Sequence, residues 1–464
     1  MEQQPKELME KIISLAKRRG FIYQGSEVYG GLAGTWDYGP LGVSLKNNIK
    51  HLWWKKFVDD RQDMYGIDAA ILMHPGVWKA SGHVDTFTDP LVECKSCNSR
   101  FRADQIKELN YFRNVLTDGF TEQGIKIEPQ TKCPKCDVEW ILGKNIEPPK
   151  NFNMMFQTQV GAVEDSSATV YLRPETAQGM FVNFKNVVDS FHPKLPFGTA
   201  QIGKAFRNEI TPRDFIFRVR EFEQMEIEYF IRESDWKTQF EYWKNEMKDW
   251  IEMIGIDTTK THELEVGEED LAHYSKRTVD FEFDFPFGKK ELYGIAYRTN
   301  FDLTNHNLTY QDEETQEKIV PHVIEPTFGL DRTILAVLCS VYREEHTEGE
   351  VRSFLSFKPS VAPVICAVSP LLKNKPELVE KSQEVFKMLK KRFGRVMFDD
   401  NGNIGKRYRR QDEIGTPWCV VVDFDTLGEN PELLDTVTVR DRDTGMQTRL
   451  PITELESYIS EKLA

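Results

Sequence analysis

The sequence predicts an α+β protein: a mainly antiparallel sheet with flanking helices, followed by a separate C-terminal α/β domain. Three observations predict this class. With 464 residues the chain is too long for one hydrophobic core, which indicates two or three domains. Residues 151–358 alternate strand-like runs with Gly/Pro turns, as antiparallel sheets do. After Lys358-Pro359-Ser360, strands alternate with helices instead, which is typical of a compact α/β unit.

Residues 1–90 are expected to form the first part of the core. An amphipathic helix is predicted over residues 5–19, and Gly20 ends it. A Gly- and aromatic-rich loop, residues 30–42, leads into a second helix. One face of that helix carries an apolar stripe that is either core or subunit interface, formed by Leu45, Ile49, Leu52, Trp53 and Phe57.

Residues 91–150, bounded by Pro90 and Pro148-Pro149, are expected to be an insertion with a helix near 103–116. It holds two Cys-x-x-Cys pairs, which in a cytosolic chain indicate a tetrahedral zinc site, with four unliganded thiols as the alternative. The four cysteines are Cys94, Cys97, Cys133 and Cys136. The other three, Cys339, Cys366 and Cys419, lie in apolar runs and are expected to be buried and inert.

The second part of the core is expected at residues 151–358, with a charged, helical surface insertion near 235–280. Residues 359–464 are expected to form the C-terminal domain. Its predicted strands and helices are a strand at 361–368, a helix at 376–392, strands at 395–398, 418–422 and 436–440, and a final helix at 452–463.

Composition excludes several classes of protein. The hydrophobic fraction of 40% and charged fraction of 29% are typical of soluble globular chains, and no run approaches the length of a membrane span. The first residues lack the apolar core of a signal peptide, so a cytoplasmic location is expected. A net charge of −14 disfavours a general nucleic-acid coat. Any nucleic-acid contact is therefore expected to use local basic clusters.

Two segments carry the strongest functional signal. In the first, Arg207 and Glu209 share a parity before a short turn, and a second strand continues the same face with Arg218, Arg220, Phe222, Gln224 and Glu226. Such a face offers guanidinium groups for phosphates, an acceptor for an exocyclic amine and a ring for a base. The alternative is a solvated, salt-bridged hairpin.

The second segment runs from Val323 through Gly329 to Arg332 and continues into an apolar helix, residues 333–341. A strand, a glycine and an arginine at a helix start form an anion site, because helix-end amides and a guanidinium converge there. The alternative is an ordinary helix start with a surface arginine.

Together these segments resemble motifs 2 and 3 of the class II aminoacyl-tRNA synthetases, and Gly39-Pro40-Leu41 with the following helix resembles motif 1. Over essentially its full length the chain is similar to the homodimeric glycyl-tRNA synthetases. The stretches that carry this narrower resemblance are residues 74–83, 172–179 and 291–296, and residues 404–417 for the anticodon-binding domain.

The resemblance implies an ATP site in which Arg207 holds the α-phosphate, Glu209 accepts from the adenine amine, Phe222 stacks on the base and Arg332 grips the γ-phosphate. Arg207 and Arg332 would be the catalytic pair. The full ATP-binding set is Arg207, Asn208, Glu209, Phe217, Arg218, Val219, Arg220, Glu221, Phe222, Glu291, Leu292, Gly329, Leu330, Asp331 and Arg332. Glu291 and Glu325 would hold Mg²⁺.

The resemblance also implies a glycine pocket in which Glu175, Glu226 and Glu325 surround the ammonium group and leave no room for a β-carbon. The expected glycine-binding set is Arg100 (with Arg102 as its competitor), Glu175, Phe222, Glu223, Gln224, Met225, Glu226, Glu325, Pro326, Thr327, Phe328 and Gly329.

The expected activity is ATP-dependent attachment of glycine to tRNA(Gly) through a glycyl-adenylate, by a homodimer with Mg²⁺ and a structural Zn²⁺. No membrane or DNA partner is expected. A basic loop with Lys406, Arg407, Tyr408, Arg409 and Arg410 is expected to contact anticodon bases. The main alternative is a non-catalytic nucleic-acid-binding relative with the synthetase fold, which would have lost Arg207, Glu209 and Arg332. All three are present.

Overall fold

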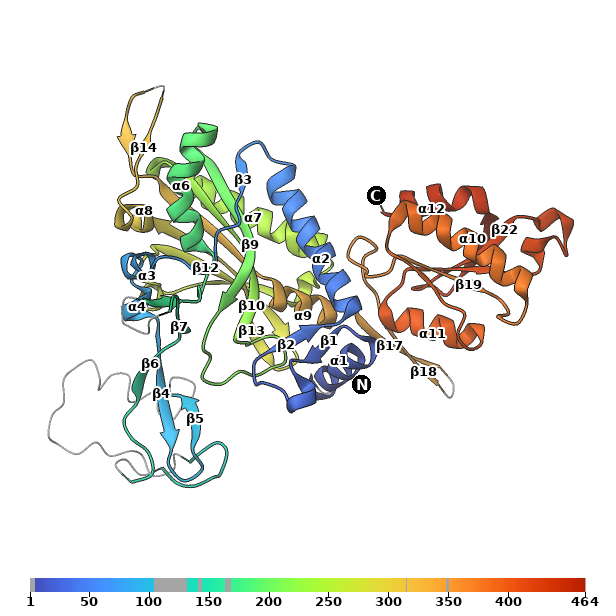
Figure 1. Ribbon diagram of the computed structural model, residues 1–464, viewed down its shortest axis with the longest axis horizontal. Coiled ribbons are helices and arrows are strands. Elements are labelled where there is room, and N and C mark those ends of the chain that lie inside the picture. The colour runs from blue at the N-terminus through green and yellow to red at the C-terminus, as the bar shows by residue number, and fades with distance from the viewer. Residues whose placement is uncertain are drawn as a thin grey trace.

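The computed structural model describes residues 5–103, 132–140, 144–162, 168–313, 315–347 and 350–463. A large sheet-and-helix body lies at the centre, a small β-extension projects from one side, and the C-terminal body lies at the opposite end (Figure 1). The helix expected near 103–116 falls, apart from Ala103, outside the described residues. Among the described helices, none has the length and apolar character needed to cross a membrane.

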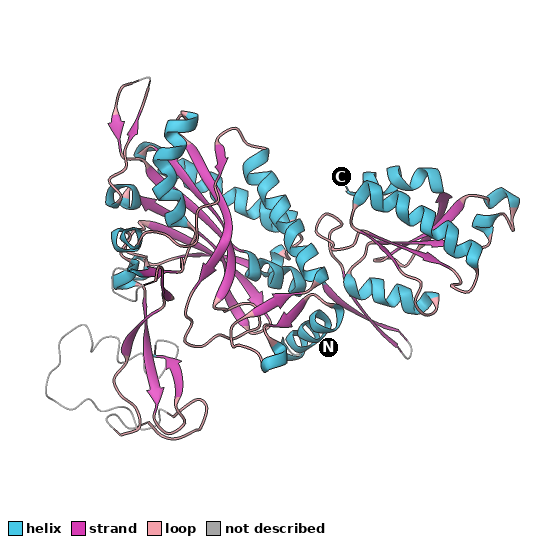
Figure 2. Cartoon of the chain, viewed as in Figure 1, coloured by secondary structure: helices cyan, strands magenta, loops and turns pink. Residues whose placement is uncertain are grey.

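The central body is built on one seven-stranded sheet (Figure 2). All neighbouring strands are antiparallel except the edge pair β3–β9. In spatial order the strands are β11 (Thr261–Glu265), β12 (Arg277–Phe285), β13 (Gly288–Thr299), β16 (His322–Gly329), β10 (Glu221–Ile231), β9 (Phe197–Phe206) and β3 (Met64–Gly66). The predicted antiparallel core is therefore confirmed.

Helices cover the two faces of this sheet unequally. One face is closed by the main hydrophobic cluster, which includes side chains of α1 (Pro5–Arg19), α2 (Pro40–Trp54), α7 (Trp236–Met253) and α9 (Leu330–Val341). The other face is covered at one end by α6 (Ala177–Phe191), whose Phe184 packs on Phe197 and Phe230 of the sheet. The rest of that second face carries the candidate active site.

The apolar stripe on α2 belongs to the core of the protomer. Leu45, Ile49 and Trp53 are completely buried, and Phe57, in the π-helical turn Lys55–Asp59 that follows, packs on Trp250 and Phe328. Of the two readings of this stripe, the structure supports core. The first helix matches its prediction, from Pro5 to Arg19.

The prediction of a charged surface insertion near residues 235–280 is wrong. α7 packs on the sheet, and β11 and β12 are strands of it. The stripe formed by Phe240, Trp243, Met247 and Trp250 is completely buried. These residues recur at helical spacing, so their burial holds α7 on the core although the rest of the helix is highly charged.

The C-terminal body has its own five-stranded sheet and its own hydrophobic cluster. Its strands, in spatial order, are β20 (Val396–Phe398), β19 (Cys366–Pro370), β21 (Trp418–Val422), β22 (Thr436–Asp441) and β23 (Gln447–Pro451), with helices α10 (Pro376–Phe393), α11 (Ile404–Ile414) and α12 (Leu455–Leu463). Most predicted elements are observed. The first strand begins at Cys366, not at Val361, and the expected basic loop at 404–410 is helix α11.

Helix α11 also touches the central body. Glu413 at its end pairs with Arg18, at 3.1 Å, and with Arg19 of α1. Asp412 pairs at 2.9 Å with Arg352 of β18 (Glu350–Leu355), which forms a hairpin with β17 (Tyr342–Thr347).

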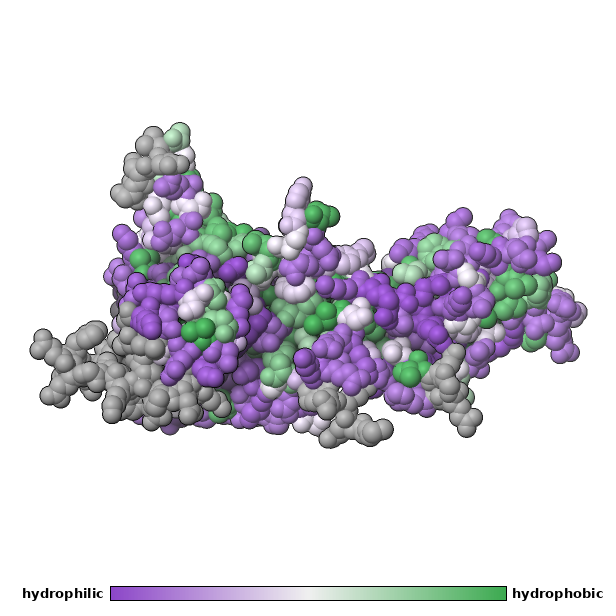
Figure 3. Space-filling view, turned by 90° about the horizontal axis from the view of Figure 1, so that it is seen from below, coloured by the Kyte–Doolittle hydropathy of each residue, from purple (hydrophilic) through white to green (hydrophobic). Residues whose placement is uncertain are grey.

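The surface seen in Figure 3 carries apolar groups only in scattered patches among hydrophilic side chains.

The remaining elements are short. The β-extension has the sheet β5-β4-β6, made of β4 (Thr88–Cys94), β5 (Ser99–Arg102) and β6 (Lys150–Asn153). The others are β1 (Ile22–Gln24), β2 (Trp36–Tyr38), α3 (Pro75–Ala80), α4 (His83–Thr86), β7 (Gln157–Gln159), β8 (Thr169–Tyr171), α8 (Phe301–Asn305), β14 (Tyr310–Gln311) and β15 (Lys318–Ile319).

Candidate active site

Strand register brings the two predicted motifs together. On β10 and β16, Gln224 lies opposite Gly329 and Glu226 lies opposite Thr327. On the next strand, β13, Gly294 lies opposite Thr327. Since side chains alternate between faces, the even-numbered residues of β10 and the odd-numbered residues of β16 share the open face of the sheet.

The hairpin itself differs from its prediction. β9 ends at Phe206 and β10 begins at Glu221, so residues 207–220 form a long loop, not a short turn. The backbone N–H of Arg207 still donates to the Arg220 carbonyl at 2.9 Å, which keeps Arg207 over the sheet. The expected face is therefore built partly by strand and partly by loop.

A first pocket lies between this loop and the start of α9. Most of the predicted ATP-binding side chains line it. The lining residues from that set are Arg207, Glu209, Phe217, Arg218, Val219, Phe222, Glu291, Leu292, Gly329, Asp331 and Arg332.

The cations of this pocket converge on one space. The Arg207 guanidinium lies 5.5 and 5.3 Å from the ring centroids of Phe87 and Phe222, and Arg332 lies 4.5 Å from that of Phe217. Burial lowers the pKa of Arg218, and Glu209 opposes this effect only in part. Its Nη1 is buried without a hydrogen-bond partner. A polyanion would relieve this concentration of positive charge.

Asp331 ties the pocket to the rest of the core. Its Oδ1 accepts from the Tyr38 hydroxyl at 2.5 Å, and its Oδ2 accepts from the backbone N–H of Glu223 at 2.8 Å. Three segments that are far apart in the sequence thus share one hydrogen-bonded network. Asp331 acts here as a fixed acceptor beneath the pocket.

Four residues of the predicted ATP set do not line this pocket. Arg220 donates to the carbonyl oxygens of Glu209 and Ala33, and so fixes the loop. The Asn208 backbone donates to the Met154 carbonyl, Glu221 pairs on the surface with Lys204, and Leu330 is buried in the core. In the sequence these positions lie between lining residues, so contiguous family motifs include them.

A second pocket adjoins the first and shares Arg207, Gln224, Glu291 and Thr327 with it. Its wall contains the three carboxylates predicted to surround an ammonium group, Glu175, Glu226 and Glu325. All three predicted carboxylates therefore meet in one cavity.

Each carboxylate is held by different partners. Glu325 accepts from Arg298 Nη1 at 2.6 Å, and Glu226 accepts from the hydroxyl groups of Thr327, at 3.0 Å, and Thr176. Glu175 Oε1 accepts from Gln178 at 3.2 Å. These bonds fix the positions of the oxygens relative to one another.

Their ionisation differs as well. Burial raises the pKa of Glu325 well above its ordinary value, and the charge of Arg298 opposes this shift. Burial and the neighbouring Glu175 raise the pKa of Glu226. For Glu175, the effect of burial is outweighed by the neighbouring His83, Arg298 and Arg207 side chains, so its pKa is lowered. Glu175 is therefore the carboxylate of the three that is most strongly held in its ionised form.

Four residues of the predicted glycine set point away from this cavity. Glu223 pairs with Lys46 at 2.6 Å and Lys50 at 3.1 Å on the α2 side, and Met225 and Phe328 are completely buried in the core. Pro326 is buried and shares the parity of Phe328 on β16. Strand alternation separates them from Gln224, Glu226 and Thr327.

Arg100 lies outside both pockets. It pairs with Glu93 at 3.0 Å on the exposed surface of β5. Its competitor Arg102 is more buried, pairs with Asp89 at 2.6 Å and acts electrostatically on Arg218. Arg102 is therefore the nearer of the two to the first pocket.

Sequence reasoning missed Arg298, Asp302, Gln178 and His83 as parts of the site. Arg298 and Asp302 are each 1% exposed, and their bidentate ion pair has N–O distances of 2.8 and 2.9 Å. Their i, i+4 spacing was the available signal, but it is equally typical of a surface pair.

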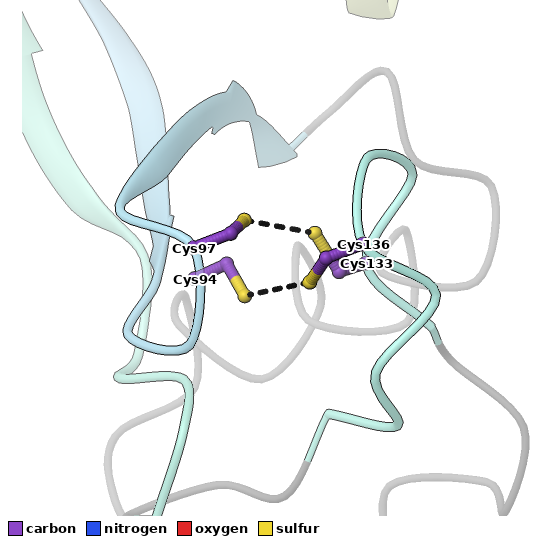
Figure 4. Close-up of side chains that lie close together, drawn as sticks. All are labelled: Cys94, Cys97, Cys133 and Cys136. Atoms are coloured by element: carbon purple, nitrogen blue, oxygen red, sulfur yellow. Dashed lines mark hydrogen bonds between the residues drawn. The ribbon is translucent and has the colours of Figure 1, made fainter.

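The four paired cysteines face one another (Figure 4). Cys94 and Cys136 have their sulfur atoms 3.8 Å apart, and Cys97 and Cys133 have theirs 3.6 Å apart. A tetrahedral ion with Zn–S bonds of about 2.3 Å requires S–S separations of roughly 3.8 Å. The donor set therefore fits zinc in both chemistry and spacing.

The basic residues of α11 divide into two groups. Arg407 is 2% exposed and donates to the carbonyl oxygens of Pro370, Asp400 and Gly402. Arg410 pairs with Asp399 at 2.6 Å. Lys406 and Arg409 are exposed. Arg407 thus serves the fold of the C-terminal body and is not presented to a ligand.

Comparison with known proteins agrees with this architecture. Residues 161–342 match the tRNA synthetase class II core domain (G, H, P, S and T), and residues 365–462 match the anticodon binding domain. The chain is 49% identical over 468 residues to a glycine–tRNA ligase of Caldanaerobacter subterraneus subsp. tengcongensis, covering 98% of each chain.

A glycine–tRNA ligase of Acetivibrio thermocellus is 50% identical over 470 residues, which cover 98% of this chain and 99% of that protein. Among solved structures, the fold is similar to that of Giardia lamblia prolyl-tRNA synthetase in complex with prolyl-adenylate. The TM-score is 0.69 at 16% identity, over 100% of this chain and 80% of that one, which is a likeness of fold.

Proposed function

This chain belongs to the class II aminoacyl-tRNA synthetases, among the glycine–tRNA ligases, and from that premise we propose how its two adjoining pockets perform the reaction. The enzyme attaches glycine to tRNA at the expense of ATP. A glycine carboxylate oxygen attacks the α-phosphorus and pyrophosphate leaves. The 3′-terminal hydroxyl of the tRNA then attacks the adenylate carbonyl, and AMP leaves.

The first pocket holds ATP. Arg207, at the boundary of the two pockets, contacts the α-phosphate, where negative charge grows during attack. Arg332 and Arg218 receive the other phosphates, Glu209 accepts from the adenine amine, and the base lies against Phe222. The single observation that carries this proposal is the position of Arg207, since only a group shared by both pockets can stabilise the bond that joins their contents.

The second pocket holds glycine. Glu175, Glu226 and Glu325 receive the ammonium group, and Gln224 and Thr327 complete the wall. Gly329, also expected there, lines the first pocket instead. Every competing amino acid is larger than glycine. An added methyl group in a rigid cavity costs roughly 1–3 kcal/mol, so hydrogen-bonded carboxylates that cannot move apart supply steric selection.

Mg²⁺ fits beside Glu291, the carboxylate that lines both pockets and pairs with Arg332 at 3.1 Å. Burial and the charges of Glu291 and Glu282 raise the pKa of nearby Asp280 to about 7, so a divalent ion would relieve repulsion there. When bound, the ion supplies charge neutralisation for the phosphates. Glu325, the other expected Mg²⁺ ligand, is engaged by Arg298, and we assign it to the ammonium group.

Zn²⁺ is proposed at the four cysteines, where the sulfur spacing supports it. tRNA(Gly) is proposed to contact the exposed residues of α11 through its anticodon region. We also propose a homodimer in the cytoplasm. The dimer is supported by family resemblance alone, because the α2 stripe is used inside the protomer. The cytoplasm is supported by the tRNA substrate.

The decisive experiment is glycine-dependent ATP–pyrophosphate exchange by Arg207→Ala. Exchange should fall by at least roughly 100-fold, as when one preorganised charge stabiliser is removed, while tRNA binding survives. Arg213→Ala is the matched control, because Arg213 lies in the same loop, pairs with Asp214 and is 46% exposed. Unchanged exchange by Arg207→Ala would rule out the role assigned to Arg207, whereas absence of exchange by the parent protein would favour the non-catalytic alternative.

A further inference from the structure

A buried histidine stands directly behind the second pocket. His83 is the first residue of α4 and is 8% exposed. Its Nε2 lies 3.3 Å from Glu175 Oε2, and its Nδ1 lies 2.8 Å from the Ser81 hydroxyl. The three side chains form a continuous line from α4 to the wall of the cavity. His83 does not line either pocket.

The donor in the His83–Glu175 hydrogen bond follows from the chemistry of the carboxylate. An ionised carboxylate only accepts, so His83 Nε2 carries the proton and donates to Glu175. Gln178 Nε2 donates to the other oxygen of Glu175, at 3.2 Å. Both oxygens of Glu175 therefore accept hydrogen bonds from outside the cavity, one from α4 and one from α6.

The imidazole ring is itself held in place. Trp78 and Phe87 pack against it, each with a centroid separation of 5.5 Å. Gly82, immediately before it, has φ 81°, a left-handed conformation that disfavours a side chain and fixes the turn between α3 and α4. The ring has little freedom to rotate away from Glu175.

We propose that His83 is a positioning residue for glycine: its Nε2–H holds the Glu175 carboxylate at the place and angle at which it receives the substrate ammonium group. This inference rests on the proposed glycine site. A carboxylate without this donor is free to rotate, and both the attraction to the ammonium group and the steric limit on larger substrates weaken.

Two substitutions separate positioning from packing. In His83→Gln the side chain is long enough to bring an amide N–H close to the position of Nε2. In His83→Asn the amide reaches only as far as Nδ1, so the bond to Glu175 is lost. His262→Asn is the matched control, because His262 pairs with Asp284 on the exposed edge strand β11.

The measurement is ATP–pyrophosphate exchange with the full-length enzyme, giving kcat and KM for glycine and for ATP separately. We expect His83→Asn to raise the KM for glycine by about 10- to 100-fold, the effect of losing a hydrogen bond to a charged group, with the KM for ATP within about threefold of the parent. His83→Gln should stay within about threefold for both. In a Glu175→Gln background, His83→Asn should add less than about twofold.

Three results would overturn the proposal: a parental KM for glycine in His83→Asn, an equal loss in the Gln and Asn variants, or additive effects of His83→Asn and Glu175→Gln. If the Asn variant does not fold, the Gln variant decides, since a tenfold rise in its KM for glycine contradicts positioning and a parental value supports it. Glycine-dependent exchange by the parent and by His262→Asn tests the proposed function separately.

Discussion

The guanidinium of Arg298 and the carboxylate of Glu325 form an ion pair of 2.6 Å with side chains only 1% and 8% exposed. Arg298 extends from β13 beneath the second pocket and also holds Asp302 through two further hydrogen bonds. One buried cation therefore fixes a wall of the pocket to α8. The charge of the pocket and the stability of the core depend on the same side chain.

Replacing Arg298 with methionine should lower the free energy of unfolding by about 3–5 kcal/mol, because it leaves buried carboxylates without a partner. Chemical denaturation measures this loss, which should shrink at lower pH as Glu325, whose pKa is raised by burial, takes up a proton. Arg277→Met is the matched control. Arg277 pairs with Glu241 and Glu265 near the surface, so its replacement should lower the free energy of unfolding by at most about 1 kcal/mol. Equal losses in the two variants would contradict the network.

His322 should make stability depend on pH. Burial lowers its pKa, with Glu233 opposing and Lys276 adding to the shift, and its Nδ1 lies 2.6 Å from the Tyr297 hydroxyl. The unfolded chain therefore binds this proton more readily than the folded one, and stability is lost as pH falls through the ordinary histidine value near 6.5. His322→Gln should show a shallower fall in unfolding free energy between about pH 7 and pH 5. Parallel curves for the two proteins would exclude this role.

Protein purified without chelator should contain about one zinc ion per chain. Cys97→Ser removes one of four thiolate ligands, so metal analysis should show most of the zinc lost. Cys339→Ser is the control, because Cys339 is buried in α9, away from the cluster. Absence of zinc from the parent protein would leave the cysteine cluster as four thiols without changing the account of the pockets.

Substitutions at the adjacent α11 residues Lys406 and Arg407 should have different effects. Lys406→Ala should weaken tRNA binding in filter or fluorescence assays and reduce its salt dependence, because an exposed cation contacts phosphate. Arg407→Ala should instead lower the unfolding temperature of the protein, because Arg407 is buried against three backbone carbonyls. If Arg407→Ala weakened tRNA binding with unchanged stability, the division of α11 would be wrong.

Strand alternation made the open face of the sheet predictable. Phe222, Gln224 and Glu226 share a parity, and the structure places all three at the pockets. The same rule could have removed Glu223, Met225 and Phe328 from the predicted glycine-binding set. Family motifs are contiguous in sequence, whereas a pocket uses alternate residues.

Other features needed three-dimensional information. The length of the loop 207–220 depends on where β9 and β10 stop pairing, which no local pattern marks. Arg298 and His83 are recognisable only when the partners that bury them are known, since neither has a distinctive neighbour in sequence. α7 is different: its aromatic stripe was visible, and the high charge of its other face obscured it.

The most direct test of the central claim is exchange activity with glycine and alanine in turn, using the unaltered enzyme. If Glu175, Glu226 and Glu325 form a cavity that excludes a β-carbon, kcat/KM for alanine should be lower than that for glycine. The cost of overpacking predicts a difference of at least about 10- to 100-fold. Comparable values for the two amino acids would contradict the account.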